Sequence, residues 1–454
     1  MRVLIANHRY FVASGAERYL FNVASELEAR GHVVMPFAMR HKDNAPTPYA
    51  RYFVSAIGAE DQLYFSDYCR SPKAILKSFP RLFYSKEVER AAERMARETQ
   101  PDVAYVLLYL RKLSPSLLVG LKRAGAPIVV RLSDYGMFCA QTYCLRNEKP
   151  CTACQAGSLL PSVVHGCVES SRIVSAIHAL AMRLQRARGY FDLVDQFVVT
   201  NAFMLESMQR AGLPRERLTC IPTFVDINRF APPVDEALHK PYVLFCGRLH
   251  RAKGAHLLIE AMRLLRAQGR RMRLRIAGVG QDERYVDALK LQVGDAHLTE
   301  QIEFEGHVDP AAVPALYQHA LCSVAPALSF ENLPNAVLES LACSAPVIAS
   351  DVGSLACTLT DGFDSLLFPA GDAVALAERI GRLADDPALR ARLSQGARTT
   401  AVRLHAPEAH LTRLLGLFER LARPQTAVPP QALGFLPESE VQLPVLADVP
   451  QRPP

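Results

Sequence analysis

Apolar and polar positions alternate along the chain in blocks that predict short strands separated by amphipathic helices. In the first half, short apolar runs with the character of buried strands lie at 3–6, 33–38, 102–107, 127–132, 196–200 and 218–221. Segments with helical periodicity separate them, the first at 16–30. Because strands that are apolar on both faces are typical of parallel sheets with helices on each side, the pattern predicts βαβ units.

The second half repeats this rhythm more plainly. Its predicted strands lie at 242–246, 274–277, 302–305, 322–325 and 347–350, and helical segments at 256–265, 284–292, 313–319 and around Glu339 lie between them. We therefore predict an α/β fold of two doubly wound, Rossmann-like domains facing a central cleft. The cleft is the expected ligand site.

Three segments break the alternation. Residues 222–235 are rich in proline and polar residues and read as a connection between domains, so we expect domains at 1–222 and 223–406. Residues 139–167 hold five cysteines and read as an insertion in the first domain. Residues 424–454 carry many prolines and few charges, which predicts a disordered tail.

The amino-acid composition limits the classes of binding partner that we expect. The 454 residues include 52 Lys+Arg against 45 Asp+Glu, and the net charge of +7 suits phosphorylated ligands or an anionic membrane surface. There is no tryptophan and no zinc-finger or recognition-helix pattern, so we expect no nucleic-acid partner. The first residues run straight into a strand without a signal-peptide core, so we expect a cytoplasmic protein with mostly reduced cysteines.

One basic helical segment is a candidate for membrane binding. Residues 172–188 carry Arg172, Arg183, Arg186 and Arg188 and no acidic residue, so this segment could lie on acidic lipid at the inner face of the membrane. The alternative, which common helix patterns favour, is a solvated face with its apolar residues turned to the core.

The cysteine-rich segment raises a separate question. Cys151 and Cys154 form a C-x₂-C knuckle, and Cys144 and Cys167 lie at distances along the chain that a tetrahedral structural zinc could use. The irregular outer spacing and the additional Cys139 favour the alternative, reduced cysteines on an insertion. Metal analysis of purified protein distinguishes the two.

Two cations and two glycines follow the first strand of the second half. Gly247, Arg248, Lys253 and Gly254 lie between the strand at 242–246 and the next helix, at the edge of a parallel sheet where anionic ligands bind. Glycines allow close backbone approach, and the arginine fork and the lysine charge can meet the oxygens of a diphosphate. Solvated loop charge is the alternative.

Two carboxylates bracket a helix entry later in the same half. If Pro334 lies in the first helical turn, Glu331 and Glu339 are about 80° apart around the helix axis and can face one ligand. Carboxylates accept hydrogen bonds from vicinal hydroxyls, and the free amides of Asn332 and Leu333 add donors. The segment is typical of a sugar-nucleotide site, although a capped surface helix has the same features.

Two glycine turns complete the pattern. Gly278 and Gly280 end the strand at 274–277, which alone is a weak nucleotide signal. Ser14, Gly15 and Glu17 form the first strand-to-helix turn of the chain, whose amides could approach a donor phosphate or acceptor, or simply cap the helix.

Taken in order, these motifs resemble those of retaining glycosyltransferases of family 4. The resemblance rests on Gly247-Arg248 with Lys253-Gly254, the Gly278 turn, Glu305-Gly306, the Glu331–Glu339 pair, the strand after Pro346 and the Ser14–Arg18 loop. It implies a GT-B architecture with an acceptor-binding first domain, a donor-binding second domain and a helix at 407–423 that crosses back to the first.

The resemblance also assigns roles. Arg248 and Lys253 would hold the diphosphate, Glu331 the sugar hydroxyls and Glu339 the ribose of a nucleotide-diphosphate sugar. Fixed cations stabilise the leaving diphosphate, so no metal or other cofactor is required. The residues expected to be catalytic are Arg248, Lys253 and Glu331. Those expected to bind the donor are Gly15, Gly247, Gly278, Asn332, Leu333 and Glu339, and Glu17, Ser133 and Asp134 are candidates to line the cleft.

One position departs from the family pattern. Ser133 precedes Asp134 where many relatives carry a histidine that touches the donor sugar, which puts donor identity in doubt. We expect transfer of a sugar to a saccharide or lipid-linked saccharide acceptor in cell-surface polysaccharide or glycoconjugate assembly. The alternatives are a sugar-nucleotide epimerase of the same fold and a noncatalytic sugar-nucleotide-binding subunit.

Overall fold

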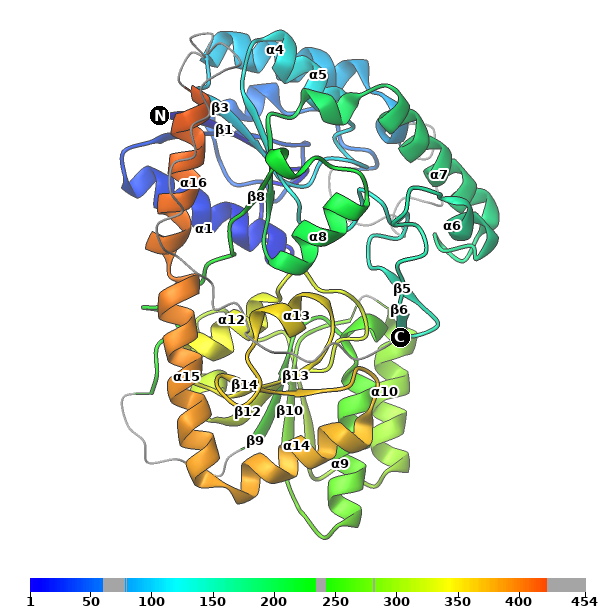
Figure 1. The fold of residues 1–454 in the computed structure, drawn as a ribbon, viewed down its shortest axis with the longest axis vertical. Coiled ribbons are helices and arrows are strands. Elements are labelled where there is room, and N and C mark those ends of the chain that lie inside the picture. Colours follow the sequence, from blue (N-terminus) through cyan, green and yellow to red (C-terminus); the bar gives the residue numbers. More distant parts are fainter. Residues whose placement is uncertain (60–77, 79, 234–241, 281, 423–454) are drawn as a thin grey trace. The chain divides into compact units, whose positions relative to one another are not determined.

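The structure is a computed structural model that describes residues 1–59, 78, 80–233, 242–280 and 282–422. Residues 1–422 form one compact unit, which contains two six-stranded parallel sheets (Figure 1). The disordered tail expected at 424–454 and the last two residues of the expected connection, 234–235, fall outside the described residues.

The first sheet has the strand order β2-β1-β3-β4-β7-β8, with every pairing parallel. The order changes direction between β1 and β3, which makes this the switch point where open α/β sheets bind ligands. The strands span Arg2–Ala6 (β1), Val33–Phe37 (β2), Val103–Val106 (β3), Ile128–Arg131 (β4), Gln196–Val199 (β7) and Leu218–Cys220 (β8). The principal helices span Gly15–Ala29 (α1), Lys86–Thr99 (α4), Ser116–Arg123 (α5), Arg172–Ala187 (α7) and Ala202–Arg210 (α8).

The second sheet has the order β11-β10-β9-β12-β13-β14 and is also parallel throughout. Its switch point lies between β9 and β12. The strands span Tyr242–Cys246 (β9), Arg273–Ala277 (β10), Ile302–Gly306 (β11), Ala320–Ala325 (β12), Val347–Ser350 (β13) and Ser365–Phe368 (β14). The helices span Ala255–Ala267 (α9), Glu283–Asp295 (α10), Val313–Gln318 (α11), Asn335–Ala342 (α12), Gly353–Thr358 (α13) and Ala373–Asp385 (α14).

Each sheet is buried on both faces, as the continuous apolar strands predict. In β1, Leu4 and Ala6 pack toward α4 and α5, whereas Val3 and Ile5 pack toward α1. Side chains alternate across a strand, so a strand between two helical layers must be apolar at every position.

Two long helices close the described chain, Pro387–His405 (α15) and Pro407–Ala422 (α16). α16 packs Leu411, Leu414, Leu417 and Phe418 into the same cluster as Val3, so the last helix covers the first sheet. The helix expected at 407–423 therefore occupies 407–422 and lies against the first half of the chain.

The cysteine-rich insertion forms a small hairpin, Leu145–Arg146 (β5) and Lys149–Pro150 (β6), and a short helix, Leu160–Val164 (α6). Cys144 and Cys151 flank the hairpin, and the Cys151 amide donates to the Cys144 carbonyl at 2.7 Å. Cys154 and Cys167 are likewise free thiols. Within the described residues no three His, Cys, Asp or Glu side chains are placed to hold a metal ion, so the zinc hypothesis gains no geometric support.

Candidate functional site

The loops at the second switch point are shaped by close backbone contacts. Gly278 has φ +145°, and a Cβ atom there would lie 1.9 Å from the carbonyl oxygen of Gly247. Gly254 has φ +72°, and its Cβ would lie 1.9 Å from the carbonyl oxygen of Pro326. Only glycine fits either position, so the loops after β9, β10 and β12 are held together at the sheet edge.

Lys253 and Glu331 meet at this edge. The Lys253 ammonium donates to Glu331 Oε2 at 2.7 Å, with 24% and 14% of the two side chains exposed. Each group is therefore partly desolvated and compensated by the other. The cation predicted to bind the diphosphate, Lys253, and the acid predicted to bind the sugar hydroxyls, Glu331, are therefore in direct contact.

Arg248 extends from the same loop into solvent. Its side chain is exposed, and among the described residues it forms no hydrogen bond or ion pair. The guanidinium fork thus remains open to a planar or tetrahedral oxyanion beside Lys253.

Glu339 lies on α12, but its surroundings differ from those of Glu331. The carboxylate is buried, with Oε1 accepting from Arg18 at 2.5 Å and Oε2 accepting from the Tyr317 hydroxyl at 3.1 Å. Both oxygens of the predicted ribose contact are therefore already engaged by the protein.

The expected geometry of the two acids needs correction. Pro334 is the N-cap of α12 rather than a residue of its first turn, so Glu331 lies in the preceding loop and not on the helix. The helix cannot extend back to Glu331 because Leu333, which lies between Glu331 and Pro334, has φ +70°, a backbone angle that an α-helix cannot contain. The separation of about 80° around one axis therefore does not apply.

The two predicted amide donors next to Glu331 also differ from expectation. The Leu333 amide is not free, because it donates to Ser354 Oγ at 3.2 Å. The Asn332 side chain turns to the first half of the chain, where its amide donates to the Leu132 carbonyl at 3.1 Å and its oxygen accepts from Thr200.

The first-half loop before α1 approaches the same helix. The Asn335 side-chain amide and the Gly15 carbonyl are 3.4 Å apart. Glu17 is fully buried: Ser14 Oγ donates to Oε2 at 2.5 Å, whereas Oε1 lies 3.9 Å from the Arg9 guanidinium and has no hydrogen-bond partner among the described residues. Gly15 thus lies near the predicted donor site, whereas Glu17 is enclosed beneath the loop.

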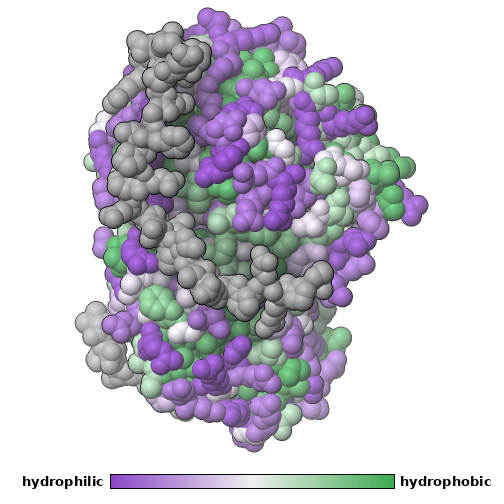
Figure 2. Space-filling model, in the orientation of Figure 1, coloured by the Kyte–Doolittle hydropathy of each residue, from purple (hydrophilic) through white to green (hydrophobic). Residues whose placement is uncertain are grey.

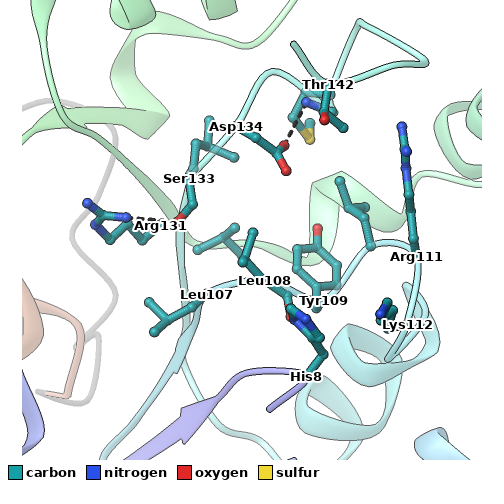
Figure 3. Close-up of a pocket in the computed structure, with 15 residues that line it drawn as sticks. His8, Leu107, Leu108, Tyr109, Arg111, Lys112, Arg131, Ser133, Asp134 and Thr142 are labelled. Atoms are coloured by element: carbon teal, nitrogen blue, oxygen red, sulfur yellow. Dashed lines mark hydrogen bonds between the residues drawn. The ribbon is translucent and has the colours of Figure 1, made fainter. Parts of the chain in front are cut away.

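Ser133 and Asp134 line a pocket of about 210 Å³ at the first switch point (Figure 3). Ser133 Oγ accepts from Arg131 at 2.8 Å, and Asp134 accepts from the Gly136 amide at 2.8 Å. Burial raises the pKa of Asp134, and the Gly136 hydrogen bond and nearby Arg111 oppose that rise. The pocket is formed entirely by residues from the first half of the chain.

Several residues at these sites were not singled out from the sequence. Arg18 and Tyr317 hold Glu339, although no sequence spacing connects them. Tyr109 and Arg111 line the first-half pocket directly after β3. Their position after a strand at the carboxyl edge of a parallel sheet was the signal that could have found them.

The paired sheets and the position of the site define a GT-B fold, as the sequence predicts. Sucrose-phosphate synthase from Thermosynechococcus elongatus has the same fold, with a TM-score of 0.70, 20% identity, and coverage of 92% of this chain and 98% of that one. Anabaena HepE in complex with UDP-glucose gives a TM-score of 0.63 at 16% identity and covers 92% and 100%. At these identities the likeness concerns the fold alone.

Sequence comparison adds the family model described as glycosyl transferases group 1, which matches residues 226–400. A D-inositol 3-phosphate glycosyltransferase of Acidothermus cellulolyticus is 30% identical over 48% of this chain and 51% of its own length. A phosphatidyl-myo-inositol mannosyltransferase of Mycobacterium leprae is 32% identical over 40% and 46%, and the amylovoran biosynthesis glycosyltransferase AmsK of Erwinia amylovora 28% over 41% and 44%. The chain thus spans about half the length of these curated relatives.

No helix in the described part of the chain is long and apolar enough to cross a membrane.

Proposed function

We propose that this chain is a retaining glycosyltransferase of the family 4 type, which moves a hexosyl group from a nucleotide-diphosphate sugar to a saccharide or lipid-linked saccharide. The observation that carries the proposal is the Lys253–Glu331 contact beside the open Arg248 guanidinium at the β9/β12 switch point. This site lies inside the segment that matches the glycosyltransferase model.

The chemistry follows from where charge develops. The bond between the anomeric carbon and the diphosphate oxygen breaks, the acceptor oxygen bonds to that carbon, and the acceptor proton passes to the departing phosphate. Arg248 and Lys253 stabilise the diphosphate as it gains negative charge, which lowers the barrier more than it strengthens ground-state binding. Donor binding would let Lys253 exchange Glu331 for phosphate and leave Glu331 to accept from sugar hydroxyls.

Ribose recognition by Glu339 requires a rearrangement in this proposal. Arg18 must leave Glu339 Oε1 for the ribose hydroxyls to take its place. The side chain of Arg18 is 44% exposed, so it can move into solvent at modest cost. The solved HepE structures hold UDP and UDP-glucose, which makes uridine nucleotides the first donors to test.

A biosynthetic role in surface polysaccharide or glycoconjugate assembly is supported by the names of the relatives, one of which acts in amylovoran biosynthesis. The test is incubation with a panel of radiolabelled nucleotide sugars and crude acceptor extracts. Label transferred to a saccharide or lipid fraction supports the proposal. An epimerised donor with no transfer indicates the epimerase instead, and binding without either reaction indicates a noncatalytic subunit.

We further propose that helices α6 and α7 rest on an anionic membrane. Of thirteen exposed large hydrophobic side chains among the described residues, five lie on these helices: Leu160, Val164, Ile173, Leu180 and Leu184. The apolar residues of α7 are thus not all turned to the core, and Figure 2 shows hydrophobic side chains gathered in this region. α7 contains two exposed arginines, Arg172 and Arg183, has a third at its C-cap, Arg188, and contains no acidic residue. Exposed apolar groups beside cations suit anionic lipid.

A further inference from the structure

Among the described residues that line the pocket at the first switch point, cations outnumber carboxylates. They include Arg111, Lys112 and a single carboxylate, Asp134. Arg131 also borders the pocket, but that guanidinium donates to Ser133 at 2.8 Å (Figure 3) and to Thr223 at 2.8 Å. Burial and the nearby Lys112 and Arg9 charges lower the pKa of His8 well below its ordinary value, so this imidazole is neutral.

Arg111 lies in the pocket without a charged partner in contact. Among the described residues it forms no ion pair, and one guanidinium nitrogen donates to the Ala140 carbonyl. Burial lowers the pKa of Arg111, and nearby Asp134 opposes that shift. A desolvated guanidinium gains most from a nearby anion.

Tyr109 supplies a second, independent indication. Its side chain is 4% exposed, and its hydroxyl has no hydrogen-bond partner among the described residues. Figure 3 shows this hydroxyl directed into the pocket, toward the space between Asp134 and Arg111. A buried hydroxyl without a partner is costly, so its position favours a ligand that completes the bond.

We propose that this pocket binds a negatively charged group, phosphate or carboxylate, carried by the acceptor saccharide. The inference rests on the proposed function, because it assigns the acceptor to the first half of the chain. Arg111 and Lys112 neutralise the oxyanion, and the Tyr109 hydroxyl donates to one of its oxygens.

The test is calorimetric titration of the full chain with glucose 6-phosphate, glucuronate and glucose, in the absence of nucleotide. The two anions distinguish phosphate from carboxylate, and glucose reports neutral sugar binding. We expect at least one anion to bind about 10-fold or more tightly than glucose, since hydrogen bonds to charged groups are the strong ones. Tyr109→Phe should weaken that anion about 10-fold, and Arg111→Gln by at least as much. The exposed Arg90→Gln on α4, which loses the same charge outside the pocket, should bind like the wild type.

Equal binding of glucose and both anions, or anion binding unchanged in Tyr109→Phe and Arg111→Gln, would overturn the inference. Thermal melts of each variant confirm that it folds. A parallel titration of the wild type and Arg248→Ala with UDP separates the two proposals. Absence of UDP binding by the wild type, with anion binding intact, counts against the proposed function alone. Intact nucleotide binding without anion preference counts against the pocket alone.

Discussion

At the scale of single residues, the site is a set of charges that already compensate one another before any ligand binds. Lys253 pairs with Glu331 and Arg18 pairs with Glu339, whereas Arg248 stays open. A ligand with both phosphates and hydroxyls can replace each of these partners, which is what a nucleotide sugar offers.

The two cations should matter most for turnover. We expect Arg248→Ala and Lys253→Ala each to lower kcat/KM about 10²- to 10³-fold, because each removes stabilisation of the leaving diphosphate. Arg266→Ala, an exposed arginine on α9, is the control that removes equal charge away from the site. Sugar-transfer kinetics measure the effect, and turnover unchanged in both site variants would contradict these roles.

Site residues that follow from local sequence position could be predicted, whereas those that depend on contacts between distant segments could not. Arg248 and Lys253 follow from one rule about strand ends, so sequence position was enough. Arg18 lies 321 residues from Glu339, and only folding brings them together. The hydrogen bond of the Leu333 amide could not be predicted either, because it depends on the backbone angle of Leu333 and on Ser354 in α13.

At the scale of elements, the alternation of strands and helices could be predicted because burial on both faces leaves a plain apolar pattern in every strand. The start of α12 could not, since Pro334 fits either a first turn or an N-cap. The outward apolar face of α7 was also hidden, because periodicity shows that a face exists but not which side is covered.

That face makes a prediction about lipid binding. Replacing Ile173 and Leu180 by Ser should reduce co-sedimentation with vesicles that contain phosphatidylglycerol by about 10-fold or more, since both buried apolar area and arginine contacts hold the helix there. The matched control replaces Val374 and Val402, which are also exposed large hydrophobic residues but lie elsewhere on the chain. Binding that is equal in both double variants, or equal on neutral vesicles, would contradict a membrane face.

Helices α15 and α16 contain two buried histidines that predict a pH dependence. Burial lowers the pKa of His405 and of His410 to about 4. Each stays neutral when folded but binds a proton near pH 6.5 when unfolded, so their contribution to stability is complete above about pH 6.5 and is lost as the pH falls toward 4.

Urea denaturation between pH 7 and pH 4.5 measures this effect. We expect the free energy of unfolding to fall less steeply with decreasing pH in His405→Asn and in His410→Asn than in the wild type. Each substitution should reduce the number of protons taken up on unfolding, which sets this slope, by up to about one. His307→Asn, at an exposed position, should keep the wild-type slope. Slopes that match the wild type in both buried-site variants would show that these histidines are not held neutral.

At the scale of the whole molecule, contacts of the residues next to Lys253 and Glu331, at the proposed donor site, join the two halves of the chain. The Tyr135 hydroxyl donates to the Glu331 carbonyl at 3.2 Å, and Asn332 bonds Leu132 and Thr200. Residues next to the donor site therefore report on the acceptor side as well, which couples the two substrates in this account.

The most direct test is calorimetric titration with UDP, GDP and ADP and with their monophosphates, on wild type, Arg248→Ala and Lys253→Ala. We predict that at least one diphosphate binds with one-to-one stoichiometry and about 10-fold or more tightly than its monophosphate, because the second phosphate meets both cations. Each substitution should remove most of that preference. Failure of every diphosphate to bind, or a preference that survives both substitutions, would contradict the assignment of the β9/β12 switch point as the nucleotide-sugar site.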